Sequence, residues 1–298
     1  MASGDILSAI ASQKTLEEVK ERLGNTDDNG GSTVDGTLMA KANKIIENTG
    51  IQTNKLDTLL TILGSGVAEF TTPGSHQIKI PAGITKIKVT ASGAGGGGGQ
   101  SNKDRASSGS GGGGGDALID REYTIPDTGK ETIINVIVGA GGKPNNDGGA
   151  TVIGDLVTLA GGKHGTITPS PGITIGGLGS GNGGNGGNGQ STEKVNTAVT
   201  STDGEDGLSG KGGKGRTAKS TNSDNPNAAC GGPGGGSLGP GGLGAAISAD
   251  FSTSEIATAG TRGGGGGGSA YIYNKSSGYW NKEAKPGGNG YVKIEWGL

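Results

Sequence analysis

The segment GLGSGNGGNGGNG occupies residues 177–189, and within it Gly-Asn-Gly recurs with a period of three. Three residues is the repeat of the polyproline II helix, which rises about 3.1 Å per residue and forms no internal hydrogen bonds. Collagen would need a strict, long Gly-X-Y register and abundant proline, whereas the whole chain has 10 prolines. The segment therefore indicates polyglycine II helices and not a collagen triple helix.

Comparable glycine tracts lie on both sides of this segment. They occupy residues 93–99, 109–115, 139–142, 210–215, 231–244 and 263–268. The chain has 69 glycines among 298 residues, about 23 %, whereas the usual share is about 7 %. Only 29 % of the residues are hydrophobic and 3 % are aromatic. Because so little apolar side chain is available, we do not expect an enzyme with a large buried pocket.

Charge and cysteine content exclude several further classes of protein. The net charge is -2 and no basic stripe is present, so a nucleic-acid partner is not expected. The single cysteine, Cys230, cannot form an internal disulfide. The first residues, MASGDILSAIASQK, lack the apolar run of a secretory signal, and no later window resembles a membrane span. We therefore expect no membrane association.

Residues 1–66 have helical periodicity. Apolar residues recur at helical spacing between Ser3 and Leu23, and a heptad pattern runs from about Thr37 to Leu63. Two arrangements would bury this stripe: an α-helical hairpin within one chain, or an oligomeric coiled-coil bundle such as a homotrimer. Either one predicts a helical attachment or oligomerisation module over 1–66.

From residue 67 onward the period changes to two, which is typical of half-buried strands. We expect strands over 75–80, 84–91, 117–125, 132–138, 150–153, 156–160 and 291–296. The last of these is expected to pair with a strand from the first half and to close one domain over 67–298. That domain is predicted to be strand-rich to about 165, with glycine tracts and variable loops over 166–286.

The glycine tracts either stay disordered as linkers or pack against one another. Ordering glycine costs about 0.5–1 kcal/mol per residue relative to alanine, so packing must be compensated by contacts. Backbones without side chains can approach closely and exchange N–H and C=O hydrogen bonds. Because the tracts alternate with strands, we favour packing, and we expect Asn182, Asn185 and Asn188 to face outward and to tolerate replacement. The predicted fold class is mainly β with packed polyglycine II helices, preceded by the N-terminal α-helical hairpin or coiled coil.

The sequence offers little support for chemistry. No GxxxxGK[ST] motif is present, and the tract at 93–99 is followed by QSNKDR and not by an amphipathic helix. His76 and His164 are far apart and lie in no motif with a serine or cysteine. Two carboxylates could still meet in space and hydrolyse a glycan, but nothing in the sequence favours this. No catalytic residue, metal ligand or cofactor is predicted.

Several segments together resemble a known family. FTTPGSHQIKIPAGITKIKVTASGAGGGGG (70–99), IINVIVGAGG (133–142), GGATVIGDLVTLAGG (148–162) and GGNGYVKIEW (287–296) resemble the glycine-rich domain of phage tail and tail-fibre proteins. The alternation of glycine tracts with variable segments is similar to the receptor-binding adhesins at the tips of T-even-type phage tail fibres. The segment around GNTDDNGGSTVDGTLMAKAN (24–43) is instead similar to phage tail proteins of Gram-positive hosts.

This resemblance implies a location and partners. It implies a polyglycine II sandwich whose loops contact a bacterial cell-surface receptor, on a virion tail or a phage-tail-like particle. Such a protein is made in the host cytoplasm and acts extracellularly. The N-terminal helices would then bind other tail or fibre proteins.

Aromatic residues concentrate in one variable segment, SAYIYNKSSGYWNKEAKP (269–286). Rigid rings bury a large area at little entropic cost, so such clusters are good contact surfaces. We expect receptor-binding residues at Tyr271, Tyr273, Asn274, Lys275, Tyr279 and Trp280, and at Phe251 in the segment 245–259. On a strand Tyr271 and Tyr273 share a face, and Ser-Ser-Gly at 276–278 can turn the chain to bring Tyr279 and Trp280 back toward them. The alternative to a receptor-binding role is a strand pair whose aromatic residues cover a thin core.

The sequence thus predicts a non-enzymatic receptor-binding protein that recognises a bacterial surface polysaccharide or protein. A purely structural tail or fibre component is the first alternative. An ice-binding polyglycine II protein is the second alternative. It would require a flat, regular face of short side chains, which the long strands and the helical N-terminus fit poorly.

Overall fold

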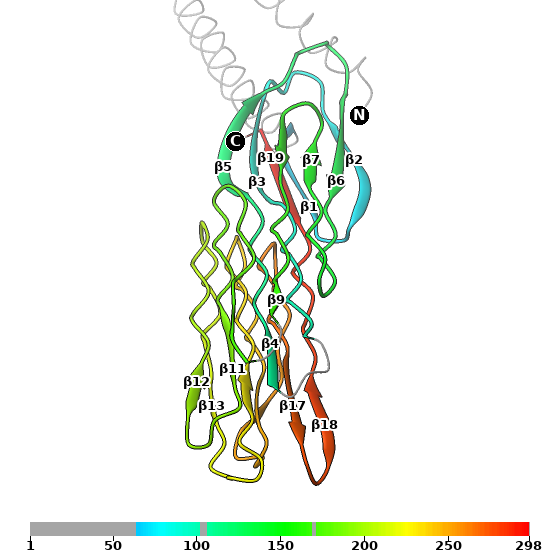
Figure 1. The fold of residues 1–298 in the computed structure, drawn as a ribbon. Helices are drawn as coiled ribbons and strands as arrows, with labels where there is room; N and C mark the ends of the chain where they lie inside the picture. The colour runs from blue at the N-terminus through cyan, green and yellow to red at the C-terminus, as the bar shows by residue number, and fades with distance from the viewer. Residues whose placement is uncertain (1–63, 102–105, 169–170, 298) are drawn as a thin grey trace, which may run out of the picture. The chain divides into compact units, whose positions relative to one another are not determined.

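The computed structural model describes residues 64–101, 106–168 and 171–297 (Figure 1). These residues belong to one compact unit, Thr61–Leu298. Within the described ranges the regular elements are all β-strands, joined by extended glycine-rich segments.

The predicted fold class needs a correction. The helical hairpin or coiled coil expected over 1–66 is not part of the described fold: residues 1–63 lie outside the described residues, and no helical element occurs in the described ones. Strand β1 (Gly66–Phe70) begins inside the range assigned to helix. Its residues alternate between more buried and more exposed positions, because the period-two pattern of a strand starts directly after Gly64. Glycine at 64 and 66 disfavours continuation of a helix.

Two antiparallel sheets form a sandwich at one end of the unit. The first has the order β1, β19 (Tyr291–Trp296), β3 (Lys86–Ser92) and β5 (Ala117–Thr124). The second has the order β2 (Gly74–Ile80), β6 (Thr132–Val138), β7 (Thr151–Ile153) and β8 (Val157–Leu159). The strands alternate, and their inward residues make the main apolar core, which includes Ile80, Val89, Val136, Ile153, Val292 and Ile294.

The last strand closes this sandwich, as predicted. β19 lies between β1 and β3, so the end of the chain joins two strands from its first third. In the register, Val292 pairs with Ala91 and Ile294 with Val89. The sheet is therefore complete only when residues 291–296 are in place.

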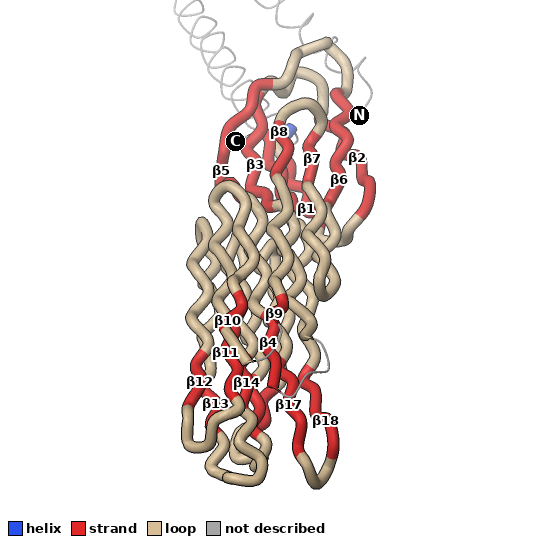
Figure 2. The backbone as a smooth tube through the Cα atoms, in the orientation of Figure 1, coloured by secondary structure: helices blue, strands red, loops and turns tan. Residues whose placement is uncertain are grey.

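Beyond the sandwich the chain passes back and forth in extended segments, which we call legs and name by their residues. Figure 2 shows these legs running side by side between the sandwich and a second group of strands. Along leg 93–99, every third N–H donates to the same neighbour, and three different neighbours are used in turn. The acceptors are Asp116, Gly113 and Ser110 for Gly93, Gly96 and Gly99; Gly149 and Asn146 for Ala94 and Gly97; and Gly288 and Lys285 for Gly95 and Gly98. The tracts are therefore packed three-fold helices and not linkers.

Three legs at the centre form a closed ring of donors and acceptors. Leg 93–99 donates to leg 109–115, which donates to leg 263–269, which donates back to leg 93–99. These three legs are buried along their length. Almost every backbone polar group inside the bundle therefore has a partner without any side chain taking part.

Glycine content follows the number of neighbours that a leg has. In the central leg 93–99 nearly every residue is glycine, and a side chain at Gly97 would overlap the carbonyl of Lys143. Leg 182–189 has glycine at two of every three positions, and leg 201–207 has about one in three. A three-fold helix presents one residue in three to each side, so each neighbouring leg requires one glycine per turn.

The outermost legs show where one expectation was wrong. Asn185 and Asn188 were expected simply to face solvent, but their Oδ1 atoms accept the N–H groups of Gly179 and Gly176 at 2.8 and 2.9 Å. Asn182 is exposed and donates to the carbonyl of Ala117 at 3.1 Å. Here side-chain oxygens accept N–H groups of leg 175–180, a part that backbone carbonyls of neighbouring legs play elsewhere in the bundle.

Carboxylates serve the same purpose on the neighbouring pair of legs. Asp203 Oδ1 accepts the N–H of Gly215 at 2.7 Å, and Asp203 Oδ2 pairs with Lys214 at 2.7 Å. Asp206 repeats this arrangement three residues along the chain. The hydrogen bond from Lys214 is the main reason why the pKa of Asp203 is lowered.

Short strands make up the end of the bundle opposite the sandwich (Figure 1). They are β4 (Ala106–Gly109), β9 (Ile167–Thr168), β10 (Ile173–Thr174), β11 (Gly189–Thr192), β12 (Ala198–Thr200), β13 (Thr217–Lys219), β14 (Ala228–Cys230), β15 (Ala246–Ser248), β16 (Ser254–Glu255), β17 (Ala270–Asn274) and β18 (Gly278–Lys282). One sheet has the order β10-β11-β14-β15-β16, another β18-β17-β4-β9, and β12 pairs with β13. Their cores are small and consist mostly of alanine with Ile247, Ile272 and Val199.

Candidate functional site

The segment that carries most of the predicted site residues folds as a hairpin of β17 and β18. Its turn is built by Asn274, whose Oδ1 accepts the N–H groups of Ser276 and Ser277 at 2.8 and 3.0 Å. Gly278 has φ +84°, which suits glycine at the end of such a turn. The predicted strand pair with a Ser-Ser-Gly turn is confirmed.

Three tyrosines share one face of this hairpin. Tyr273 lies opposite Tyr279 in the register, and their ring centroids are 4.9 Å apart. Tyr271 lies next to them, with its ring centroid 5.6 Å from that of Tyr279. Tyr279 is 59 % exposed, whereas Tyr271 is buried. Tyr271 therefore supports the exposed ring and does not itself form surface.

Trp280 lies on the other face and not against the tyrosines. It is opposite Ile272, which is buried in the small core between β15 and β17. The Trp280 ring makes an edge-to-face contact with Phe251, with centroids 4.9 Å apart and an interplanar angle of 71°. Trp280 Nε1 donates to Ser277 Oγ at 2.9 Å. Trp280 and Phe251 are 42 % and 43 % exposed, so this pair is surface as well.

Phe251 is held in an unusual backbone conformation. It lies in the loop between β15 and β16, and its φ is 58°. This is the left-handed region, where a bulky residue is a genuine outlier. Its N–H donates to the carbonyl of Ser248 at 3.0 Å, which closes the loop tightly beneath the ring.

Asp250 organises the loop on which Phe251 lies. Asp250 Oδ2 accepts the N–H and the hydroxyl of Thr221 at 2.7 and 3.0 Å. Asp250 Oδ1 accepts the hydroxyls of Ser248 and Ser252 at 2.7 and 2.8 Å. Burial alone would raise the pKa of this carboxyl, but the hydrogen bonds outweigh it and hold the pKa well below its usual range.

Three asparagines connect the neighbouring loops. Asn225 Oδ1 accepts the N–H of Lys275 at 2.6 Å, and Asn227 Nδ2 donates to the carbonyl of Tyr273 at 2.5 Å. Asn274 Nδ2 donates to the carbonyl of Ala249 at 2.6 Å. Residues 220–227, 248–253 and 273–280 thus form one hydrogen-bonded unit, which we call the distal tip.

The predicted site residues have different positions in the distal tip. Tyr279, Trp280, Phe251 and Lys275 are exposed, and Tyr273 is partly buried. Asn274 is buried and holds the turn. Asp250, Asn225 and Asn227 were not predicted from the sequence. Their only signal was the general preference of Asp and Asn for loops, since the partners lie far along the chain.

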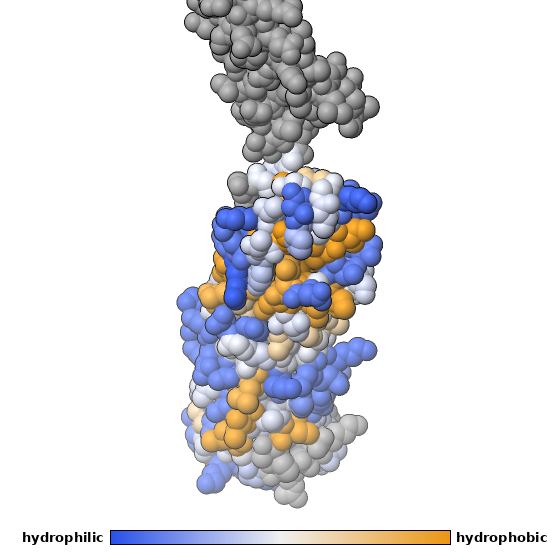
Figure 3. Space-filling model, turned by 90° about the horizontal axis from the view of Figure 1, so that it is seen from above, coloured by the Kyte–Doolittle hydropathy of each residue, from blue (hydrophilic) through white to orange (hydrophobic). Residues whose placement is uncertain are grey.

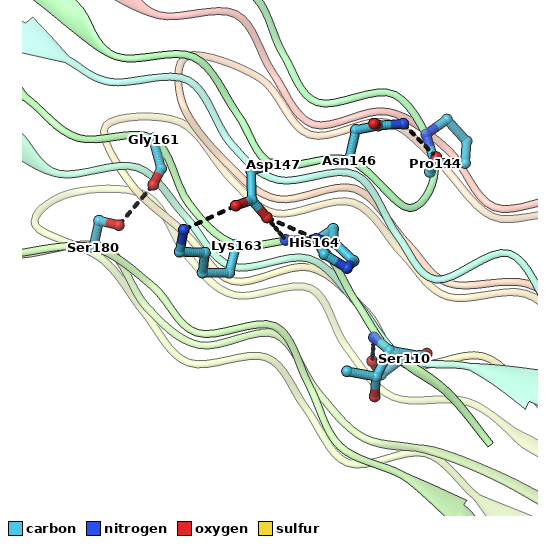
Figure 4. Close-up of polar contacts among 9 residues, drawn as sticks. Ser110, Pro144, Asn146, Asp147, Gly161, Lys163, His164 and Ser180 are labelled. Carbon is cyan, nitrogen blue, oxygen red and sulfur yellow. Dashed lines mark hydrogen bonds and ion pairs between the residues drawn. The ribbon is translucent and has the colours of Figure 1, made fainter.

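A second polar cluster lies within the bundle (Figure 4). Asp147 accepts hydrogen bonds from Lys163 Nζ at 2.8 Å and from the His164 N–H at 2.9 Å, and its Oδ1 lies 2.7 Å from His164 Nδ1. Burial alone would raise the pKa of Asp147, but these hydrogen bonds outweigh it and hold the pKa well below the usual range. The hydroxyl of Ser110, which lies apart in the same view, is bonded to the carbonyl of Ile175 at 2.6 Å. The cluster therefore anchors the turn at 143–147 and contains no nucleophile beside the histidine.

Within the described residues, no cluster of three or more His, Cys, Asp or Glu side chains is placed to bind a metal. The thiol of Cys230 is buried, and burial raises its pKa to about 12, so it is not reactive near neutral pH. No helix in the described part of the chain could span a membrane.

Apolar surface is not confined to the distal tip. Figure 3 shows it in separate areas of one face. Leg 175–180, for example, has exposed Ile175 and Leu178, which are three residues apart and therefore face the same side of a three-fold helix. The distal tip differs because its exposed residues are aromatic and its loops are bonded to one another.

Comparison with known protein families gives one match. The model of a family described as a glycine-rich domain matches residues 71–297. The match extends from just before β2 to the end of β19 and includes the sandwich apart from β1, the legs and the distal tip. No curated protein matches the chain.

Proposed function

Because the chain belongs to the glycine-rich domain family, we propose that it is a non-enzymatic receptor-binding protein of a phage tail or phage-tail-like particle. In this proposal the distal tip binds a polysaccharide or a protein on the bacterial surface. The resemblance of residues 70–99 and 287–296 to phage tail and tail-fibre proteins supports the assignment. The protein would act outside the cell in which it is made, as part of the particle.

The observation that carries the proposal is the exposure of Phe251, Tyr279 and Trp280 on a scaffold that has few side chains. An aromatic side chain buries about 150–250 Å² when it is covered. At about 25 cal/mol per Å², the apolar part of that area is a large contribution to binding. The rings are already positioned by neighbouring loops, so little entropy is lost when they are covered.

The legs explain how a few loops can be presented precisely. Each leg bonds to several neighbours through its backbone, so a displacement of one loop would break hydrogen bonds in several legs. Loops on a rigid scaffold are where recognition usually lies. The glycine bundle thus holds the loops of the distal tip at one end through backbone hydrogen bonds.

Cell binding tests the proposal directly. The full chain, labelled with a fluorophore, is added to a panel of bacterial strains and scored for coating of cells. We expect coating of at least one strain, and we expect excess free chain to block adsorption of the particle to it. A chain that coats no strain and does not compete with the particle would overturn the proposal.

A structural role without receptor contact is the second candidate, because Ile175 and Leu178 could pack against another particle protein. Substitutions at the distal tip are compared with alanine substitutions at Ile175 and Leu178. The structural role is favoured if only the alanine substitutions have an effect, and if they impair assembly of the particle without changing its host range. An ice-binding role fits less well, since the outer positions of legs 201–207 and 210–216 carry long charged side chains such as Lys211 and Lys214.

A further inference from the structure

The backbone of Phe251 is the one strained feature of the distal tip that bears directly on an exposed ring. A phenylalanine at φ 58° would relax to a negative φ if nothing held it. Such conformations persist only where the surroundings enforce them, and they concentrate at functional sites. A neighbouring residue must therefore hold the backbone of Phe251 in the left-handed region.

Asp250 does so through five accepted hydrogen bonds. Three come from Ser248 and Ser252 within the same loop, and two come from Thr221 in a different loop. The bonds to Thr221 tie the loop that carries Phe251 to the loop 220–227, which is itself bonded to the hairpin through Asn225. Without Asp250 the loop keeps the backbone bond from Phe251 to Ser248 but loses the carboxylate that joins Ser248 and Ser252 to Thr221.

We propose that Asp250 is a positioning residue for receptor binding: it keeps Phe251 in its left-handed conformation, with the ring in edge-to-face contact with Trp280, before the receptor arrives. This inference rests on the proposed function of the distal tip. Asp250 itself makes no contact with the receptor in this account. Its contribution is to raise the fraction of molecules whose tip is ready to bind.

A positioning residue and a contact residue have different kinetic signatures. If only a fraction of molecules has the competent conformation, the apparent dissociation constant rises in inverse proportion to that fraction. The loss then lies in the association rate, because the bound complex is unchanged. Removing a contact mainly raises the dissociation rate. Asp250→Ala and Phe251→Ala should therefore weaken binding in different ways.

The experiment uses the full chain and envelope vesicles from a strain that the unmodified chain coats. We expect Asp250→Ala to lower the apparent affinity at least about tenfold, which is the scale of a hot-spot truncation, through slower association with an unchanged dissociation rate. Phe251→Ala should raise the dissociation rate. Asp155→Asn, which removes an exposed charge in the turn between β7 and β8 and lies outside the distal tip, is the matched control and should change neither.

A spectroscopic measurement reports positioning without any receptor. The chain has two tryptophans, Trp280 and Trp296, so labelling with 5-fluorotryptophan and recording ¹⁹F NMR separates the distal tip from the sandwich. Asp250→Ala should shift or broaden the Trp280 resonance and leave that of Trp296 unchanged. If Asp250→Ala also disturbs Trp296, Ser252→Ala takes its place, since it removes one donor to Asp250 and should act in the same direction but less strongly.

Two results would overturn the inference: a Trp280 resonance unchanged by loss of Asp250, or a loss of affinity found entirely in the dissociation rate. Failure of the proposed function would be different. In that case the unmodified chain would coat no strain, and the NMR measurement would still decide whether Asp250 holds the ring.

Discussion

Gly66 and Trp296 face each other across β1 and β19, and the indole ring of Trp296 fills the space in which a side chain at residue 66 would lie. The first and last strands of the described fold are thus fitted to each other at this pair. Because β19 also pairs with β3, this contact is part of the closure of the sandwich.

Substitution at residue 66 should therefore destabilise the fold. We expect Gly66→Ala to lower the free energy of unfolding by about 1–3 kcal/mol, the usual range for overpacking, which is a fall in melting temperature of roughly 2–4 °C per kcal/mol. Gly64→Ala is the control, because its nearest contact would be Ile84 at an ordinary 3.9 Å. Thermal unfolding followed by circular dichroism measures both, and equal melting temperatures would contradict the prediction.

The outer legs allow a graded test of bundle packing. Gly184→Ala should be most destabilising, again by about 1–3 kcal/mol, because its methyl group would overlap the carbonyl of Glu205. Asn185→Ala should cost about 0.5–1.5 kcal/mol through loss of its bond to Gly179. Asn182→Ala should have the smallest effect, since the carbonyl that it leaves can bind water. The same melting temperature for Gly184→Ala and Asn182→Ala would argue against packed legs.

Acid should weaken the fold partly through Asp147. Hydrogen bonds from Lys163 and His164 lower the pKa of this carboxyl in the folded state. Its contribution to the free energy of unfolding is therefore fully present above the ordinary carboxyl pKa, about 3.9, and is lost as the pH falls through the pKa of the folded state. We expect Asp147→Asn to melt below the unmodified chain near pH 6, and the difference to shrink as the pH approaches 2. Because the side chain is partly exposed, solvent screening keeps the effect modest. A difference in melting temperature that does not change with pH would contradict the assignment.

The distal tip should separate binding from stability. Tyr279→Ala and Trp280→Ala remove exposed rings and should each reduce cell binding at least about tenfold, equivalent to roughly 1.4 kcal/mol or more. The folded state should persist in both. Tyr271→Ala is the counterpart on the same hairpin: because that ring is buried, we expect a loss of about 3–5 kcal/mol of stability. Unfolding of the first two variants would instead assign these rings to the core.

Residue 251 should show the strain of its backbone. Phe251→Gly and Phe251→Ala both remove the ring, but only glycine adopts φ 58° without penalty. We expect the glycine variant to be more stable than the alanine variant by about 1 kcal/mol. Chemical denaturation of the two variants measures this difference. An alanine variant at least as stable as the glycine variant would show that the loop relaxes freely.

The long strands and the packing of the tracts could be predicted from the residues themselves. Residues 132–138 and 291–296 were predicted as strands and are strands with those bounds. The short strands at the far end, such as β10 and β16, have two residues each and cannot display a period. β1 was missed because Gly66, Ala68 and Phe70 form an inward row too small to resemble a strand face.

Among the site residues, local pattern predicted the hairpin but not its two faces. Ser-Ser-Gly after Asn274 is a turn signal in any context, and it placed Tyr279 beside Tyr273. Trp280 was expected to lie beside these tyrosines. Because side chains alternate between the two faces of a strand, it lies on the opposite face, where its ring contacts Phe251 from a loop almost thirty residues earlier. No local signal connects those two rings.

The sequence by itself determined that this chain could not rely on a large apolar core and that glycine would recur with the period of a three-fold helix. It also determined how many sides of each leg must be free of side chains, because each neighbour requires one glycine per turn. Only the tertiary structure decided which leg lies beside which, where Asp250 finds Thr221, and which rings remain exposed. The physical reason is that backbone hydrogen bonds between glycine legs are chemically alike, so the partner of each is decided by the closure of the whole fold.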